Sequence, residues 1–237
     1  DLLDSSVNPP SRVAAMSLDG QRMVSIYNSN TAHVWDALSG SKLIELVGHM
    51  ARINSVAFSP DGHHVVTGSE DKSARVWDVH SGMSLVELIG HTGVVNSAAF
   101  SPDGRWIITG SVDKTARIWD ANTGKSIVEL LGHGDSVTSV SFAPNGQQVL
   151  TGSLDKSARI WDARSGKTLI NMVGHTAKIV DVSYSLDGQR IVTASADQTA
   201  RTWDAQMGES IIELQGHMDQ VNSAAFSPDG LRIITGA

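Results

Sequence analysis

The stretch T-G-S-E-D-K-S-A-R-V-W-D, residues 67–78, decides the fold because it returns almost unchanged further along the chain. Residues 109–120 read T-G-S-V-D-K-T-A-R-I-W-D, and residues 151–162 read T-G-S-L-D-K-S-A-R-I-W-D. The three copies are separated by a constant step of 42 residues. A fixed period of this length is typical of repeat architectures, in which each repeat forms one supersecondary unit.

Three shorter markers keep the same step over most of the chain. Trp-Asp pairs occupy residues 35–36, 77–78, 119–120, 161–162 and 203–204. Gly-His pairs occupy residues 48–49, 90–91, 132–133, 174–175 and 216–217. Asp-Gly or Asn-Gly turns occupy residues 19–20, 61–62, 103–104, 145–146, 187–188 and 229–230. The register contains no insertion, so we interpret the chain as one continuous array of repeats.

One repeat, read in detail, predicts four short strands. Residues 53–59 form an apolar run, and the Pro-Asp-Gly that follows favours a tight hairpin turn. Further strands are expected at residues 65–68, 74–77 and 84–88, separated by polar turns. Such a sheet cannot bury both faces alone, whereas copies arranged radially can pack on one another. We therefore predict an all-β fold, a β-propeller of four-stranded antiparallel blades.

These markers resemble those of the WD-repeat β-propeller family, and the resemblance covers nearly the whole chain. It places Gly-His on the loop from the outer strand of one blade to the inner strand of the next. Blades are then expected at residues 13–47, 49–88, 91–130, 133–172 and 175–214, with a partial blade at 217–237 and a lead-in segment or closing strand at 1–12.

The blade count implies an open ring. It amounts to about five and two-thirds blades. An open propeller exposes two unpaired faces, which is an aggregation hazard. We therefore expect the chain to be part of a longer polypeptide whose propeller has seven or more blades.

The resemblance also implies a hydrogen-bonded tetrad of His, Thr, Asp and Trp in each regular blade. The four sets are His49, Thr67, Asp71 and Trp77; His91, Thr109, Asp113 and Trp119; His133, Thr151, Asp155 and Trp161; and His175, Thr193, Asp197 and Trp203. A buried carboxylate and a buried imidazole are costly unless they are paired. A catalytic centre needs a unique cluster, whereas these residues recur in every blade, so we expect a structural role, no catalytic residue and no metal site.

The first and last blades keep only part of the tetrad. The first keeps Ser25 and Trp35, and the last keeps His217 and Thr235. We expect both blades to be less stable than the others, because their networks are incomplete.

Positions that differ between blades would carry binding specificity. By the resemblance, partner-binding positions on the top rim are Arg52, Asn54, Glu70, Val94, Asn96, Val112, Ser136, Thr138, Leu154, Lys178 and Val180. Val94, Val112 and Leu154 would form an apolar patch flanked by charged residues, which is how a protein interface is built. The alternative is that these are scattered loop residues.

The composition of the chain argues against several classes of function. The 237 residues carry a net charge of −7 and no cysteine. The negative charge argues against binding to nucleic acid or to anionic membrane lipids. No apolar run is long enough for a transmembrane helix. The absence of cysteine excludes disulfides and fits a cytoplasmic protein.

No nucleotide-binding, zinc-protease or hydrolase motif appears in the sequence, and no cofactor is expected. We expect a non-enzymatic scaffold or sensor domain of a larger multidomain protein, which binds other proteins or another domain of the same polypeptide. The alternatives are a purely structural or engineered repeat block and, as a third reading, an enzyme that uses the propeller channel.

Overall fold

The computed structural model describes residues 14–237, which form 22 strands in six antiparallel sheets. The first three sheets contain β1 (Ala14–Met16), β2 (Arg22–Asn28), β3 (Thr31–Asp36) and β4 (Lys42–Val47); β5 (Ile53–Phe58), β6 (His64–Ser69), β7 (Ser73–Asp78) and β8 (Ser84–Ile89); and β9 (Val95–Phe100), β10 (Trp106–Ser111), β11 (Ala116–Asp120) and β12 (Ser126–Leu130). The next two contain β13 (Val137–Phe142), β14 (Gln148–Ser153), β15 (Ser157–Asp162) and β16 (Thr168–Val173); and β17 (Ile179–Tyr184), β18 (Arg190–Ser195), β19 (Ala200–Asp204) and β20 (Ser210–Leu214). The sixth is a hairpin of β21 (Ser223–Phe226) and β22 (Ile233–Gly236).

The predicted fold class is confirmed. Five sheets have four antiparallel strands in sequence order, and a sixth is partial, at a spacing of about 42 residues. The partial blade expected at residues 217–237 contains one two-stranded hairpin, β21 and β22. The expectation for residues 1–12 lies outside the described residues. The total number of blades stays a prediction.

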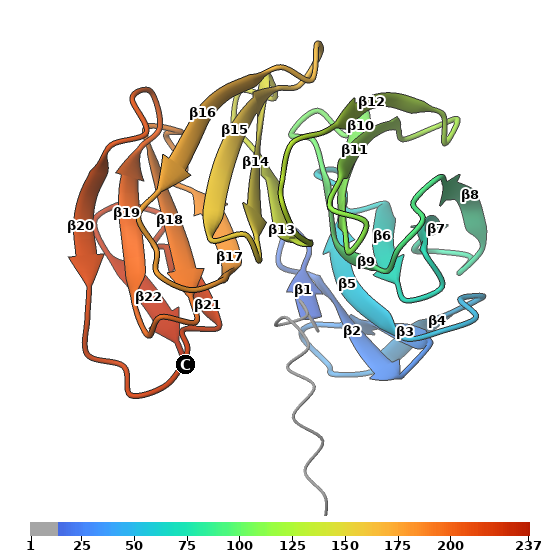
Figure 1. Cartoon of the computed structure of the whole chain (residues 1–237). Coiled ribbons are helices and arrows are strands. Elements are labelled where there is room, and N and C mark those ends of the chain that lie inside the picture. Colours follow the sequence, from blue (N-terminus) through green and yellow to red (C-terminus); the bar gives the residue numbers. More distant parts are fainter. Residues whose placement is uncertain (1–13) are drawn as a thin grey trace, which may run out of the picture.

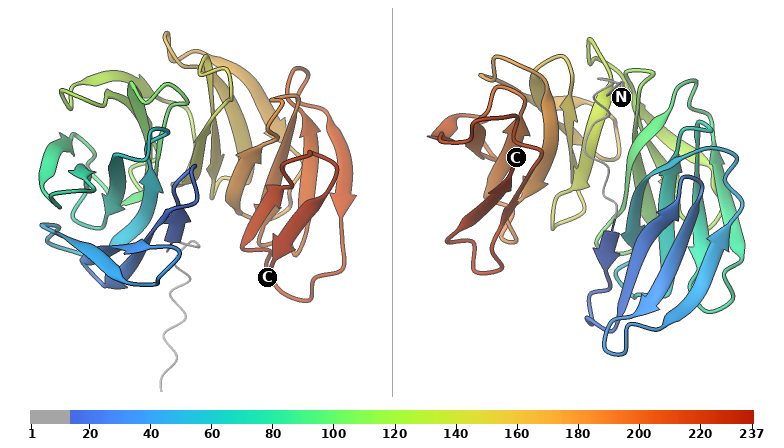
Figure 2. Two further views of the ribbon diagram at one scale, coloured as in Figure 1. Left: turned by 180° about the vertical axis from the view of Figure 1, so that it is seen from behind. Right: turned by 90° about the horizontal axis from the view of Figure 1, so that it is seen from below.

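The six sheets follow one another around an arc, with the first sheet and the β21–β22 hairpin at its two ends (Figures 1 and 2). Inner strands of neighbouring sheets lie side by side, β1 next to β5, then β9, β13, β17 and β21. Each of the five apolar core clusters lies between two neighbouring sheets, and none belongs to a single sheet. The sheets therefore depend on one another for burial, as the sequence pattern predicted.

Tryptophan fills each interface between complete sheets. Trp77, Trp119, Trp161 and Trp203 are at most 1% exposed, and each packs in the cluster shared with the preceding sheet. The equivalent Trp35, on the first sheet, is only half-buried. A fully buried aromatic side chain contributes a large apolar area, so the regular interfaces are the stable ones.

The turn between the first two strands, which reads Ser-Pro-Asp-Gly in the second, third and sixth sheets, is fixed by local contacts. In the third sheet Ser101 Oγ donates to Asp103 Oδ1 at 2.6 Å and accepts from the Trp106 backbone N–H at 2.9 Å. Gly104 has a φ of 71°, a left-handed conformation that glycine adopts without steric cost. These turns connect the first two strands of every sheet, and we call the face that carries them the bottom face. The Gly-His loops and the turns between second and third strands form the opposite, top face.

Candidate functional site

The second sheet brings the four predicted tetrad residues together. His49 comes from the loop after β4, Thr67 from β6, Asp71 from the top turn and Trp77 from β7. His49 Nδ1 lies 2.7 Å from Asp71 Oδ2, and His49 Nε2 lies 2.7 Å from Thr67 Oγ1. Trp77 Nε1–H donates to the same Thr67 oxygen at 2.8 Å. The network joins two strands, the top turn between them and the loop from the neighbouring sheet.

The same network recurs in the next three sheets. His-to-Asp distances are 2.8 Å, His-to-Thr distances are 2.7 Å, and Trp-to-Thr distances are 2.8–2.9 Å. It links His91, Thr109, Asp113 and Trp119; His133, Thr151, Asp155 and Trp161; and His175, Thr193, Asp197 and Trp203. The four threonines are fully buried.

The proton positions follow from the charges. Burial lowers the pKa of His49, and the nearby Asp71 only partly opposes this, so the imidazole is neutral. Burial alone would raise the pKa of Asp71, but hydrogen bonds from Ser73, His49 and the Met50 N–H lower it to about 2. An ionised carboxylate can only accept, so His49 Nδ1–H donates to it. His49 Nε2 must then accept from Thr67 Oγ–H, whose oxygen accepts from Trp77.

The incomplete sets form the bonds that their residues allow. Trp35 Nε1–H donates to Ser25 Oγ at 2.9 Å, and His217 Nε2 lies 2.8 Å from Thr235 Oγ1. The lower stability of these two sheets stays a prediction.

A β-bulge in the inner strand determines where the side chains of the predicted inner-strand positions point. The pairing register with the second strand shifts at Asn54, Asn96, Thr138 and Val180. A bulge redirects the extra side chain. Here three of them donate a hydrogen bond to a backbone oxygen of the next inner strand, Asn54 to Val95, Asn96 to Val137 and Thr138 to Ile179. These residues therefore link neighbouring sheets, a role that the sequence analysis missed.

Eight of the predicted partner-binding residues line one cavity of about 120 Å³ on the top face. They are Asn54, Glu70, Val94, Asn96, Val112, Ser136, Thr138 and Leu154. The apolar members, Val94, Val112 and Leu154, come from the third and fourth sheets, and Val112 is 43% exposed. Asn96, Ser136 and Thr138 are buried and form the polar part of the lining.

Three predicted positions lie outside this cavity. Arg52 is exposed and Lys178 is half-buried. Val180 is 1% exposed and belongs to the core cluster with Val221 and Ala224, between the fifth and sixth sheets. The expectation that Val180 contacts a partner is therefore wrong, because its bulge points an apolar side chain into the core.

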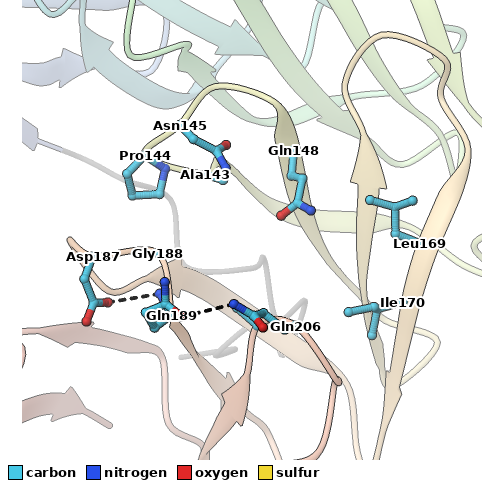
Figure 3. Close-up of a pocket in the computed structure, with 11 residues that line it drawn as sticks. Ala143, Pro144, Asn145, Gln148, Leu169, Ile170, Asp187, Gly188, Gln189 and Gln206 are labelled. Atoms are coloured by element: carbon cyan, nitrogen blue, oxygen red, sulfur yellow. Dashed lines mark hydrogen bonds between the residues drawn. The ribbon is translucent and has the colours of Figure 1, made fainter.

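The bottom face carries grooves between successive sheets that the sequence analysis did not identify. Figure 3 shows the one between the fourth and fifth sheets, of about 450 Å³, where Asn145 and Gln148 face Gln189 and Gln206. Gln206 Nε2 donates to Gln189 Oε1 at 3.2 Å, so these amides partly satisfy one another.

The neighbouring groove, between the third and fourth sheets, has about 510 Å³ and is lined by Arg105, Trp106 and Arg164. The one signal in the sequence was that Trp106 is the single tryptophan outside the Trp-Asp pairs.

Among residues 14–237, no group of three or more His, Asp or Glu side chains is arranged to hold a metal ion. In the same part of the chain, no helix is long and apolar enough to span a membrane.

Comparison with protein families gives one match. The WD40 model, described as "WD domain, G-beta repeat", matches residues 40–78, 82–120, 124–162, 166–204 and 208–237. Its boundaries follow the 42-residue register and are offset from the sheets. A search of curated proteins found no match.

Proposed function

The chain belongs to the WD40 repeat family, and on that premise we propose that it is a non-enzymatic scaffold whose top-face cavity binds a segment of another protein or of another domain of the same polypeptide. WD40 domains are typically protein-interaction scaffolds and usually non-catalytic. The single observation that carries the proposal is that eight variable positions from three sheets line one cavity.

The size and chemistry of the cavity favour a protein segment over a small molecule. Small-molecule sites have volumes of roughly 300–1,000 Å³. The top-face cavity has about 120 Å³, which suits an inserted side chain. Val94, Val112 and Leu154 supply an apolar centre, and Glu70 supplies a charge in the lining. An apolar centre with a polar rim is the usual anatomy of a protein interface.

The recurrence of the tetrads supports a non-catalytic role. Each histidine is neutral and uses both ring nitrogens in the network, and each tetrad threonine is buried. A general base or nucleophile needs a site where a substrate atom can reach it.

The proposal is tested with a displayed library of random short peptides selected against the chain. We expect the selected peptides to bind the wild-type chain and to lose binding to the double variant Val112→Asp with Leu154→Asp. The matched control is Leu131→Asp with Val173→Asp, which changes one exposed residue just after β12 and one at the end of β16 and should leave binding unchanged. Equal binding to the two double variants would refute the proposal.

A further inference from the structure

We propose that the groove between the third and fourth sheets, on the bottom face, is a second binding site that takes a short acidic peptide of a partner protein. Arg105 and Arg164 would hold carboxylates of the peptide, and Trp106 would pack against an apolar side chain between them. This site lies on the face opposite the cavity of the proposed function and does not depend on it.

Trp106 is placed differently from the other tryptophans. It begins β10, beside the turn of the third sheet, and takes no part in a tetrad. Part of its ring packs on the core cluster between the third and fourth sheets, while the residue remains half-buried and lines the groove. Two turn prolines, Pro102 and Pro144, line the same groove. Together they make a rigid apolar platform, of the kind that dominates binding energy at interfaces.

Both arginines are free to bind a ligand. Arg105 and Arg164 are exposed, and within residues 14–237 neither guanidinium forms a hydrogen bond or an ion pair. Asp103 and Asp120 attract Arg105, and Asp162 attracts Arg164, through charge alone. These three carboxylates are hydrogen-bonded within their own turns, where they accept from Ser101, Thr123 and Ser165. A guanidinium presents donors in a fork that matches a carboxylate, which suits it to bidentate binding.

The fourth sheet also lacks a negative charge at this groove. Its turn carries Asn145, where the other five turns carry aspartate. Asn145 lines the same groove, which therefore contains two cationic side chains and the single carboxylate of Asp103. The local balance therefore favours an anionic ligand on a chain whose net charge is −7.

No other pair of sheets in the described chain repeats this combination. The positions equivalent to Arg105 and Trp106 hold His63 and His64 in the second sheet and Gln147 and Gln148 in the fourth. Positions equivalent to Arg164 hold His80, Asn122 and Gln206. The indole and the two guanidiniums come together only here, which points to a specific site in an otherwise regular array.

A short peptide fits this groove better than a nucleic acid. Asp61 and Asp187 occupy the turn position on the sheets to either side, so a long polyanion would run across carboxylates beyond the groove. A short peptide places its charges only at the two arginines.

The chain itself supplies conservative variants for the test. Glutamine stands at the equivalent of Arg105 and Trp106 in the fourth sheet, and at the equivalent of Arg164 in the fifth. Arg105→Gln with Arg164→Gln, and Trp106→Gln, should therefore fold normally, which their melting temperatures would verify. The charge-matched control is Lys72→Gln with Lys156→Gln on the top face, since Gln198 stands at the same repeat position with a similar positive φ.

The probe is a short fluorescein-labelled peptide of glutamates around a single leucine, titrated by fluorescence anisotropy. We expect binding to the wild-type chain that weakens at high salt, a loss of affinity of about tenfold or more in both groove variants, and no loss in the lysine control. The same peptide with glutamine for glutamate should not bind.

Three results would overturn the inference. They are the absence of binding to the wild-type chain, an equal loss in the lysine control, and tighter binding of a single-stranded oligonucleotide at the same groove residues. Because all groove variants leave the top-face cavity intact, failure here would not affect the peptides selected for that cavity.

Discussion

Removing one buried hydroxyl tests the proton arrangement of the tetrads directly. In the third sheet Thr109 Oγ1 accepts from Trp119 Nε1 at 2.8 Å and lies 2.7 Å from His91 Nε2. Thr109→Val keeps the shape of the side chain but leaves an indole N–H and an imidazole nitrogen unpaired in the core. Each of the two unpaired buried groups costs roughly 1–3 kcal/mol, so the free energy of unfolding should fall by about 2–6 kcal/mol.

Thr109→Ser is the matched control, because it keeps the hydroxyl and loses only a methyl group, at a cost of about 1 kcal/mol. The two variants and the wild type would be unfolded in urea and followed by circular dichroism and tryptophan fluorescence. The reasoning requires a midpoint for the valine variant clearly below that of the serine variant, with an unchanged slope. Valine and serine variants that differ by less than about 1 kcal/mol would refute the hydrogen-bond assignment.

Three further outcomes follow from the same structure. In the folded chain the pKa values of the tetrad histidines lie below 6.5 and those of the aspartates below 3.8. The unfolded chain therefore binds more protons than the folded chain as the pH falls, so the melting temperature should decrease steadily from pH 7 to pH 3. A melting temperature that does not change over this range would contradict the prediction. In calorimetry Trp77→Ala should cost about 3–5 kcal/mol and Trp35→Ala less, because only Trp77 is fully buried; equal losses would count against the role of the interfaces. Gly82→Ala should lower the urea midpoint of unfolding more than Gly20→Ala does. Both glycines have a φ of 71°, but only at Gly82 would the new Cβ lie 2.9 Å from Ile44. The reverse order of midpoints would disprove the steric argument.

The sequence predicted the sheets well because each boundary has a local cause. The predicted strand at residues 53–59 corresponds to β5, which ends at Phe58, one residue before the Ser59 that closes the turn. Pro, Asp and Gly act on the backbone next to them, so their effect can be read without the rest of the structure. The tetrad sets came from the family resemblance, and in the structure each set forms a chain of hydrogen bonds from Asp through His and Thr to Trp.

The orientation of side chains on the inner strands could not be predicted from the sequence. The residues around Asn96 and Val180 do not indicate a bulge, because a bulge depends on how the strand pairs with its partner. The bulge decides whether a side chain faces a ligand or the next sheet. The bottom groove was missed for a similar reason, since Arg105 and Arg164 belong to different sheets and only their packing brings them together.

Placing every apolar cluster between sheets also determines how the molecule responds to force. Within residues 14–237 the first and sixth sheets each pack on one neighbouring sheet, so pulling on the two ends of this segment should detach one of them first. Its departure leaves the next sheet in the same situation, so extension should proceed as a series of similar steps. A repeat of 42 residues would add about 140–150 Å of extended chain per step. A force–extension trace should then show evenly spaced peaks, whose spacing corresponds to the length of one repeat.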